Sequence, residues 1–320
     1  MDKMTNPRIA ARLGMGGFAF GDLLPKLAAS DSSIYVLSAD MSSPAGLDRF
    51  KNTYPEHFIN VGIAEQNLIG VAAGMADEGN KVIVTAQACF LTMRCFEQVR
   101  QYCGLMNIPL ILVGLNSGFS LGLLGPTHYA LEDIALMRSI PNMTIIAPAD
   151  ASEAAKSLEL ALQLRQPVYL RWFGGTNIPS VYPVNYDFQA GKAVRLSNGD
   201  DVQLIAMGSM VSMALETARL LAEQGIHAEV LNMHTIHPLD TQAIRTDLPL
   251  VVTMEEHNIL GGLGTAVSEI MVENGIMKPL LKLGEQNGFL HVGDYQYLLE
   301  QAHLTPQQIA TQVKAKLDAL

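Results

Sequence analysis

The sequence has few charges, few cysteines and no long apolar run. Only 16% of its 320 residues are charged, whereas 49% are hydrophobic, so we expect a partner to cover much of its surface. The most apolar segments, such as residues 110–115, are short enough to be buried strands and do not reach membrane-spanning length. The net charge of −10 argues against nucleic acid or an anionic membrane as the main partner.

The chain has three cysteines, Cys89, Cys95 and Cys103, and no apolar secretion segment at its N-terminus. An odd number of cysteines without a secretion signal predicts reduced thiols in a cytoplasmic protein, and we expect them to pack within helices. Their spacing fits no zinc pattern. His234 and His237 form a His-x-x-His motif without an evident third ligand. Metal binding by this chain is therefore a minor alternative, and we predict no metal ligands in it.

Several catalytic motifs are also absent. The sequence contains no Walker-type lysine loop, no Gly-x-Ser-x-Gly elbow and no carboxylate-rich metal loop. Residues 14–19 loosely match a dinucleotide fingerprint, but no strand precedes them, so glycines within a helical segment are the preferred interpretation. The glycines at 261–264 follow an expected strand and open a helix, which fits either an anion site or close helix–sheet packing.

Apolar strand-like runs alternate with helical patterns through the whole chain, and helical periodicity is clearest at 90–106. In the first half, strands are expected at residues 34–37, 81–86, 109–116, 144–147 and 168–172. In the second half, strands are expected at residues 202–207, 228–233, 250–254 and 280–283. Two successive β/α alternations predict an α/β fold with two parallel-sheet domains, residues 1–175 and 190–320, joined by a linker at 176–189.

Glu65 is the only charged residue within 58–75, where a strand-like segment runs into a helix of small residues. An isolated carboxylate in such a stretch loses hydration, which favours its protonated form and suits it to proton exchange. The alternative is an ordinary acidic residue in the first turn of a helix, where it meets the positive end of the macrodipole. Ser42, Phe90 and His128 also follow expected strands, so they and Glu65 are expected to share the rim where such sheets bind ligands.

The segment Gly62-Ile-Ala-Glu65-Gln-Asn resembles the pyrimidine-binding domain of transketolase-type thiamine diphosphate enzymes. Further similar segments follow in the family's order, at 38–42, 90–100, 125–133, 141–150 and 167–171. In the second domain, residues 255–264 resemble the transketolase C-terminal domain. The resemblance therefore covers nearly the whole chain and rests on an ordered set of motifs.

The resemblance implies an enzyme that is shared between two chains. Transketolases hold the diphosphate of thiamine diphosphate through a metal in an N-terminal domain marked by Gly-Asp-Gly, and this sequence has no Gly-Asp-Gly. The chain therefore resembles the C-terminal subunit of a split transketolase. The implied partner is an N-terminal subunit that holds Mg²⁺ or another divalent metal, in an α2β2 assembly with active sites between subunits. The implied reaction transfers a two-carbon ketol unit from a ketose phosphate to an aldose.

The resemblance also assigns cofactor-binding roles to individual side chains. Glu65 would hydrogen-bond the aminopyrimidine ring of the cofactor and share a proton with it, and Phe90 would stack on that ring. Asp40 and Phe96 are further cofactor-binding candidates. For Asp40 the alternative is a turn cap, and for Phe96 it is simple packing.

Other side chains are implied to bind the substrate. His128 would contact substrate oxygens and move protons. Arg12 and Arg171 would bind the phosphate of a sugar phosphate, because a guanidinium group suits bidentate anion binding. Ser42 or Ser43 would assist. For the two arginines the alternative is surface or interface pairing.

Two positions depart from the family pattern. Asn116 stands where transketolases carry a histidine, and Leu124 stands where they carry an aspartate that binds a substrate hydroxyl. Leucine removes a polar partner and leaves an apolar wall, which disfavours a hydroxyl there. We therefore predict a branched, deoxy or otherwise modified sugar phosphate as substrate, or one whose phosphate is replaced by another anion such as a sulfonate.

Three other functions remain open from the sequence. The chain is also compatible with 1-deoxyxylulose-5-phosphate synthase-like chemistry and with the β subunit of a 2-oxo-acid dehydrogenase, because both share the domain pair and the glutamate. A non-catalytic stabilising subunit is the third alternative. The presence of Glu65 and His128 argues against it.

Overall fold

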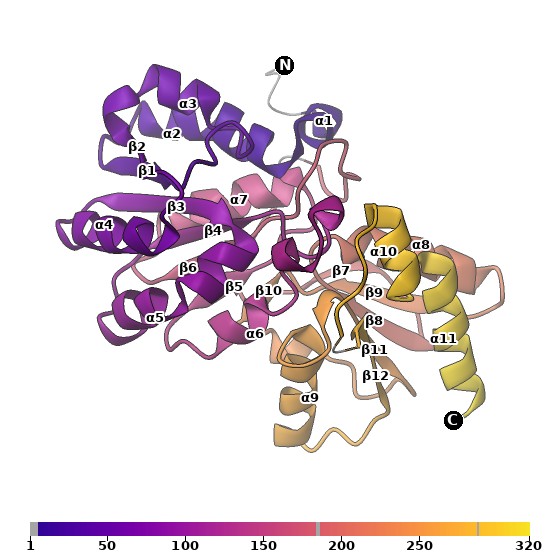
Figure 1. Cartoon of the computed structure of the whole chain (residues 1–320). Helices are drawn as coiled ribbons and strands as arrows, with labels where there is room; N and C mark the ends of the chain where they lie inside the picture. The colour runs from indigo at the N-terminus through magenta and orange to yellow at the C-terminus, as the bar shows by residue number, and fades with distance from the viewer. Residues whose placement is uncertain (1–5, 184–185, 287) are drawn as a thin grey trace.

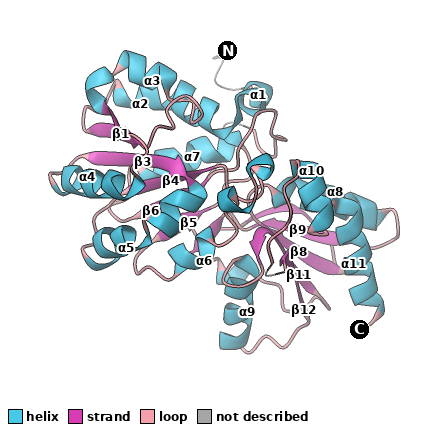
Figure 2. Cartoon of the chain, viewed as in Figure 1, coloured by secondary structure: helices cyan, strands magenta, loops and turns pink. Residues whose placement is uncertain are grey.

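The computed structural model describes residues 6–183, 186–286 and 288–320. Residues 1–5 and 287, from the two predicted domains, and residues 184–185 of the predicted linker lie outside the described chain. Two sheets are present, each with helices packed on both faces (Figures 1 and 2). The predicted α/β fold with two successive, mostly parallel-sheet domains is confirmed.

The first sheet has seven strands in the order β10-β5-β6-β4-β3-β1-β2. They are β1 (Ile34–Ser38), β2 (Phe58–Asn60), β3 (Lys81–Gln87), β4 (Ile111–Leu115), β5 (Thr144–Ile146), β6 (Val168–Arg171) and β10 (Thr235–His237). All neighbours pair in parallel except β10 and β5. β10 comes from the second half of the chain, so the first sheet is completed by residues of the predicted C-terminal domain.

The second sheet has five strands in the order β12-β11-β8-β9-β7. They are β7 (Val194–Ser197), β8 (Val202–Ala206), β9 (Ala228–Asn232), β11 (Val251–Asn258) and β12 (Leu280–Glu285). The edge strand β7 is antiparallel to β9, and the other pairs are parallel. Of the strands in this sheet, only β7 is absent from the sequence-based prediction.

Alternate residues of the first sheet face two separate cores, as the period of a strand requires. Val82 and Val84 of β3 pack in a core with Leu68 of α4, whereas Ile83 packs in a second core with Phe20. The helices of these two layers are α1 (Pro7–Phe18), α2 (Leu24–Ala28), α3 (Asp48–Thr53), α4 (Glu65–Asp77), α5 (Phe96–Val99), α6 (Asp133–Arg138) and α7 (Ala151–Ala161). The first core continues into the second domain through residues such as Met233 and Val267, so the two domains share buried surface.

The second domain carries the helices α8 (Met210–Ala222), α9 (Leu263–Glu273), α10 (Tyr295–Gln301) and α11 (Pro306–Asp318). The predicted start of α11 is confirmed, with Thr305 and Gln308 forming a capping box. Asp150 likewise accepts a hydrogen bond from the Glu153 amide at the start of α7. Local capping signals therefore fix these helix starts.

The predicted helix at 90–106 is not a regular α-helix. It consists of a π-helical turn η4 (Phe90–Arg94), the short α5 and a second π-helical segment η5 (Arg100–Leu105). Cys95, between η4 and α5, has backbone angles outside the helical region. π-Helical turns occur frequently at functional sites, and this one follows β3 at the rim of the first sheet.

Candidate active site

The carboxyl ends of β1, β2, β3 and β4 place several predicted site residues along one rim of the first sheet. Asp40 follows β1, Glu65 begins α4 after β2, Phe90 follows β3 and Asn116 follows β4. The chain order reverses at β1, which has β2 on one side and β3 on the other. Parallel sheets bind ligands at such a reversal, and the rim is therefore the candidate site.

Glu65 lies at the centre of a small cluster on this rim. Its side chain is only 5% exposed, and Oε2 accepts a hydrogen bond of 2.7 Å from Nη1 of Arg94. The Arg94 guanidinium carbon stands 4.0 Å from the centre of the Phe90 ring. Phe90 in turn meets His128 in an edge-to-face contact, with ring centres 5.2 Å apart. The structure thus brings together Glu65, Phe90 and His128, three residues that the sequence proposed.

Arg94 is the member of this cluster that sequence reasoning missed. The sequence shows Glu65 as an isolated carboxylate, whereas the structure gives it a cationic partner 29 positions later. Arg94 stands at the end of the π-helical turn that starts at Phe90. Its place within the motif that resembles the aromatic helix start was the only available signal.

A cavity of about 650 Å³ opens beside the cluster. Phe90, Met93 and Arg94 form one wall, and Pro126 and Thr127 form another. This volume is in the range of small-molecule sites, and a mainly apolar wall with a few polar groups is typical of them.

The second domain completes the cavity with Phe289, which is 75% exposed and lies in the loop after β12. That loop is tied to the first domain, because the Tyr129 hydroxyl donates to the His291 carbonyl at 3.1 Å. Sequence reasoning did not identify Phe289. Only the fold brings it to the rim.

Asp40 is fixed to the loop that leads to Glu65. Asn60 accepts from the Asp40 amide at 3.0 Å, and its own amide group donates to Asp40 Oδ1 at 3.3 Å. Asp40 has a left-handed backbone conformation, with φ of 57°. This geometry holds an exposed carboxylate at the rim, where a cofactor or substrate can reach it.

Phe96 and the cysteines belong to the core rather than to the cavity. Phe96 is partly buried and packs against the first core, which matches the packing alternative. Cys89, Cys95 and Cys103 are free and buried. Desolvation raises the pKa of the Cys89 thiol to about 11 and that of Cys95 to about 12. Buried thiols of this kind are poor nucleophiles.

A second hollow of about 240 Å³ lies farther along the rim. Asn116 and Ser43 line it, together with Trp172, Thr176 and several glycines. Asn116 donates to Gln87 Oε1 at 2.9 Å, which orients its amide. Ser43 lines this hollow, whereas Ser42 lies beside it in the same loop. No charged side chain is among the described residues that line it.

The glycines near residue 14 are explained by packing. A side chain at Gly16 would bring its Cβ within 2.4 Å of the Ala45 carbonyl oxygen, and one at Gly14 would meet the Gly175 carbonyl at 2.2 Å. Gly14 also has a positive φ of 72°. The glycines let α1 approach neighbouring loops closely, which favours the packing interpretation over a dinucleotide site.

Glu255 accepts hydrogen bonds from the amides of Leu263 and Gly264, which open α9. A Cβ at Gly262 would stand 1.9 Å from Glu255 Oε2. An internal carboxylate therefore takes the helix start that the sequence left open as an anion site.

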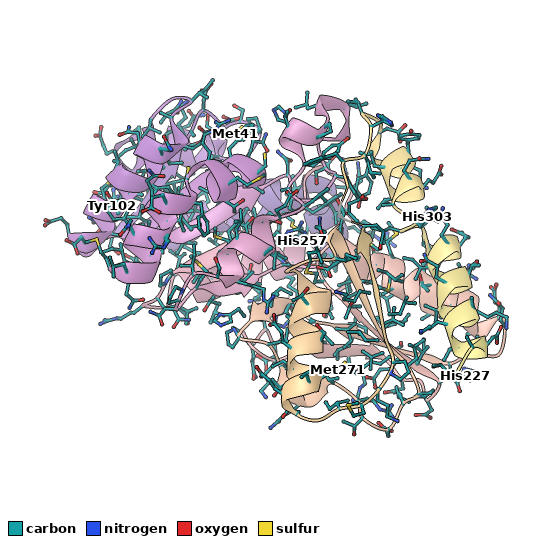
Figure 3. All side chains as sticks on the ribbon, turned by 60° about the horizontal axis from the view of Figure 1, so that its bottom comes forward. Met41, Tyr102, His227, His257, Met271 and His303 are labelled. Carbon is teal, nitrogen blue, oxygen red and sulfur yellow. The ribbon has the colours of Figure 1, made fainter. Side chains whose placement is uncertain are left out.

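The position of Arg171 does not support the predicted role in phosphate binding. Its side chain is 3% exposed, and Nε donates to Asp133 at 2.8 Å. Nη2 donates to the carbonyls of Ala130 and Glu256, each at 2.9 Å. His257 lies in the same interior region, where the two domains meet (Figure 3). Arg171 therefore joins the domains, which is the pairing alternative.

Arg12 and Leu124 are both exposed at the surface. Arg12 lies on α1, one residue before Leu13, which lines the second hollow, and it forms no salt bridge within the described ranges. Leu124 ends the turn η6 (Gly122–Leu124), directly before the turn η7 (Pro126–His128). Both therefore lie next to a hollow of the rim without lining it.

No group of three potential metal ligands occurs among the described residues. His234 is buried against Phe188, with ring centres 4.5 Å apart, and His237 Nδ1 lies 2.6 Å from the Met143 carbonyl oxygen. Across the described ranges, no helix is both long and apolar enough to span a bilayer.

Comparisons with known proteins agree with this architecture. Residues 17–172 match the family "Transketolase, pyrimidine binding domain", and residues 191–309 match "Transketolase, C-terminal domain". One of the two apulose-4-phosphate transketolase subunits of Phocaeicola vulgatus is 36% identical over 288 residues, covering 89% of this chain and 90% of that protein. The 6-deoxy-6-sulfo-D-fructose transketolase subunit SqwH of Clostridium sp. strain MSTE9 is 37% identical over 291 residues, covering 90% of each chain.

A solved structure described as a split gene transketolase, an inactive β4 tetramer, has the same fold. Its TM-score is 0.84 at 34% sequence identity, and the match covers 94% of this chain and 97% of that one. The similarity therefore extends across both domains and the junction between them.

Proposed function

The chain belongs to the transketolase family, and we propose that it is the C-terminal subunit of a two-chain transketolase dependent on thiamine diphosphate. It acts with an N-terminal subunit to transfer a two-carbon ketol unit from a ketose to an aldose. The observation that carries the proposal is Glu65, a buried carboxylate at the sheet rim whose partner Arg94 lines a ligand-sized cavity.

The residues at the rim fit the pyrimidine half of the cofactor. When bound, thiamine diphosphate supplies a nucleophilic carbon for making and breaking a bond next to a carbonyl. Phe90 offers an aromatic face for stacking, and Glu65 offers a carboxyl for a ring nitrogen. Because Glu65 is 5% exposed, water competes poorly for its proton, so a hydrogen bond from the cofactor is strengthened.

The substrate side of the site is assigned to His128, Asp40 and Asn116. His128 is half-buried beside Phe90, so its ring can exchange a proton with a substrate oxygen in the cavity. Asn116 and Ser43 supply neutral hydrogen-bonding groups in the second hollow. Arg12 is the cation nearest that hollow along the chain and is assigned to the anionic end of the substrate.

The diphosphate and its metal ion are assigned to the partner. Among the described residues, the rim offers no cluster of carboxylates for a divalent ion. An N-terminal subunit that holds Mg²⁺ or another divalent metal would complete the site. We further propose an α2β2 assembly in the cytoplasm. The proposed domains are residues 1–175 and 190–320, with a linker at 176–189.

The substrate is proposed to be a modified sugar phosphate or sulfonate. Leu124 places an apolar side chain beside the loop that lines the cavity, where a hydroxyl would lose hydrogen bonds to water. The two relatives are named for apulose 4-phosphate and for 6-deoxy-6-sulfo-D-fructose, and the second of these is a deoxy sugar that carries a sulfonate. We infer that this chain belongs to the same substrate class.

The test is to reconstitute the chain with its N-terminal partner and to compare Glu65→Gln with the wild type. We expect at least a hundredfold loss of ketol transfer, because the amide cannot share the cofactor's proton. The matched control is Glu78→Gln, which removes an exposed carboxyl at the other end of α4 and should leave the rate unchanged. Equal activity of wild type and Glu65→Gln would instead favour a non-catalytic stabilising subunit.

The same preparation separates the remaining alternatives. Decarboxylation of pyruvate with glyceraldehyde 3-phosphate or a lipoyl acceptor would indicate synthase or dehydrogenase chemistry. Turnover of xylulose 5-phosphate with ribose 5-phosphate at ordinary transketolase rates would contradict the proposed substrate class. Preferred turnover of a branched or sulfonated ketose would support it.

A further inference from the structure

Arg94 makes two contacts at once that belong to different chemical types. Its Nη1 donates to Glu65 at 2.7 Å, and its guanidinium carbon stands 4.0 Å from the Phe90 ring centre. The guanidinium group is planar and carries N–H donors in that plane. It therefore lies between the carboxylate and the aromatic face and uses both.

An aminopyrimidine ring needs the same two contacts. It is also planar, it stacks on an aromatic face, and its nitrogens exchange hydrogen bonds with a carboxyl group. The space that satisfies both Phe90 and Glu65 is small, because one planar group already spans it. A second planar group cannot make both contacts while Arg94 stays there.

We propose that Arg94 is an internal competitor of the cofactor's pyrimidine ring, which holds Glu65 until the ring displaces it. The inference rests on the proposed function and concerns how the same site is loaded. Arg94 is a positioning residue in this scheme. It keeps the Glu65 carboxylate ionised and in place before loading, and it withdraws into the open cavity afterwards.

The local structure allows the side chain to move while the backbone stays. Gln66 Nε2 donates to the Arg94 carbonyl at 3.1 Å, which ties the backbone to the start of α4. The side chain itself is 44% exposed and makes only one hydrogen bond to Glu65 among the described contacts. The cavity of about 650 Å³ that Arg94 lines gives the side chain room to turn away.

The competition has a measurable consequence. If the ring binds only when Arg94 is displaced, the apparent dissociation constant rises by the inverse of the displaced fraction. A half-exposed, charge-assisted hydrogen bond with a cation–π contact then weakens cofactor binding about threefold to thirtyfold. Removing the guanidinium should recover that factor.

The experiment titrates thiamine diphosphate, with Mg²⁺, into the reconstituted two-chain protein by calorimetry. We expect Arg94→Gln and Arg94→Met to bind the cofactor about threefold to thirtyfold more tightly than the wild type. Arg94→Lys keeps the charge but loses the planar group, so its affinity should lie between them. Arg100→Gln is the control, since Arg100 is an exposed arginine of the neighbouring segment that pairs with Glu97 at 3.6 Å. It should bind as the wild type does.

The outcomes separate this inference from the proposed function. Circular dichroism first establishes that each variant is folded, and two different replacements guard against a defect particular to one of them. If the wild type binds the cofactor and both neutral variants bind it equally or more weakly, Arg94 supports the cofactor and the inference is overturned. If the wild-type pair binds no thiamine diphosphate at all, the proposed function itself fails.

Discussion

Glu65 differs from the other buried carboxylates of the chain in the groups that surround it. Glu255 accepts from two backbone amides, and Glu256 accepts from Phe119, Ser209 and Tyr295. Those groups are fixed parts of the interior. The partner of Glu65 is a half-exposed side chain on the wall of a cavity. A carboxylate with a movable partner can be passed to a ligand, whereas an enclosed one serves the fold.

Glu153 is an enclosed carboxylate that links the two domains. It accepts from the Ala149 amide at 2.6 Å, from the Tyr186 hydroxyl at 2.7 Å and from Asn232 of β9 at 3.0 Å. Complete burial raises its pKa from 4.5 to about 7. In the folded protein, Glu153 therefore stays protonated over a pH range in which the unfolded chain has already lost that proton.

The first residue-scale prediction concerns pH. Below pH 4.5 Glu153 is protonated in both states, and between about pH 4.5 and 7 only the unfolded chain ionises, so rising pH removes stability. We expect the free energy of unfolding of Glu153→Gln, relative to wild type, to increase by about 3 kcal/mol between pH 4.5 and 8. Urea denaturation at several pH values measures this difference.

The comparison must be made between variants because other groups act in the opposite direction. Burial lowers the pKa of His234 and of His257 to about 4, so these residues add stability as pH rises from about 4 to 6.5. Glu159→Gln, on the outer side of the same helix, is the control and should differ from wild type by a constant amount. A pH-independent difference for Glu153→Gln would show that this carboxyl is ionised in the folded protein.

At the scale of elements, local patterns in the sequence account for most of the fold. Each strand of the second sheet except β7 was predicted, because each is a run of buried apolar residues. β7 and β10 were missed because they are short and carry polar residues such as Arg195 and His237. They become strands by pairing with distant segments, and a local pattern does not contain that information.

The candidate site was predictable to the extent that its residues follow strands. Glu65, Phe90 and His128 come together because the carboxyl ends of parallel strands share an edge. Arg94 and Arg171 were misjudged for the opposite reason. Their partners lie 29 and 38 positions away, and only tertiary packing decides which guanidinium is buried and which lines a cavity.

The element-scale prediction tests Arg171 as the link between β6 and β11. Replacing it with alanine leaves Asp133 buried without its cation and removes the bond to the Glu256 carbonyl. We expect Arg171→Ala to lower the free energy of unfolding by about 3–5 kcal/mol, measured by urea denaturation with circular dichroism.

The control for Arg171→Ala is Arg219→Ala. Arg219 forms its ion pairs with Glu216 and Glu223 on the surface of α8, so the variant should stay close to wild type. A phosphate-binding role would give a different result. In that case Arg171→Ala would keep its stability and raise only the KM for the anionic substrate.

At the scale of the whole molecule, apolar side chains gather around the rim that holds Glu65. Ile63 is 78% exposed only two residues before Glu65, and Leu123, Leu124 and Phe289 are exposed near the cavity. Large exposed apolar side chains at a functional site mark a surface that another chain covers. The composition of the sequence and the exposed rim therefore lead to the same expectation of a partner.

The last prediction places that partner on the side of the rim near α4. We expect Ile63→Asp to weaken association with the N-terminal subunit at least tenfold, because the new charge would be buried at the interface. Native mass spectrometry of the mixed subunits measures the fraction assembled. Met277→Asp is the control: Met277 is 91% exposed in the loop between α9 and β12, which lies far from α4 (Figure 1). Equal assembly of both variants would place the interface elsewhere, and loss of assembly by Met277→Asp alone would place it on the second domain.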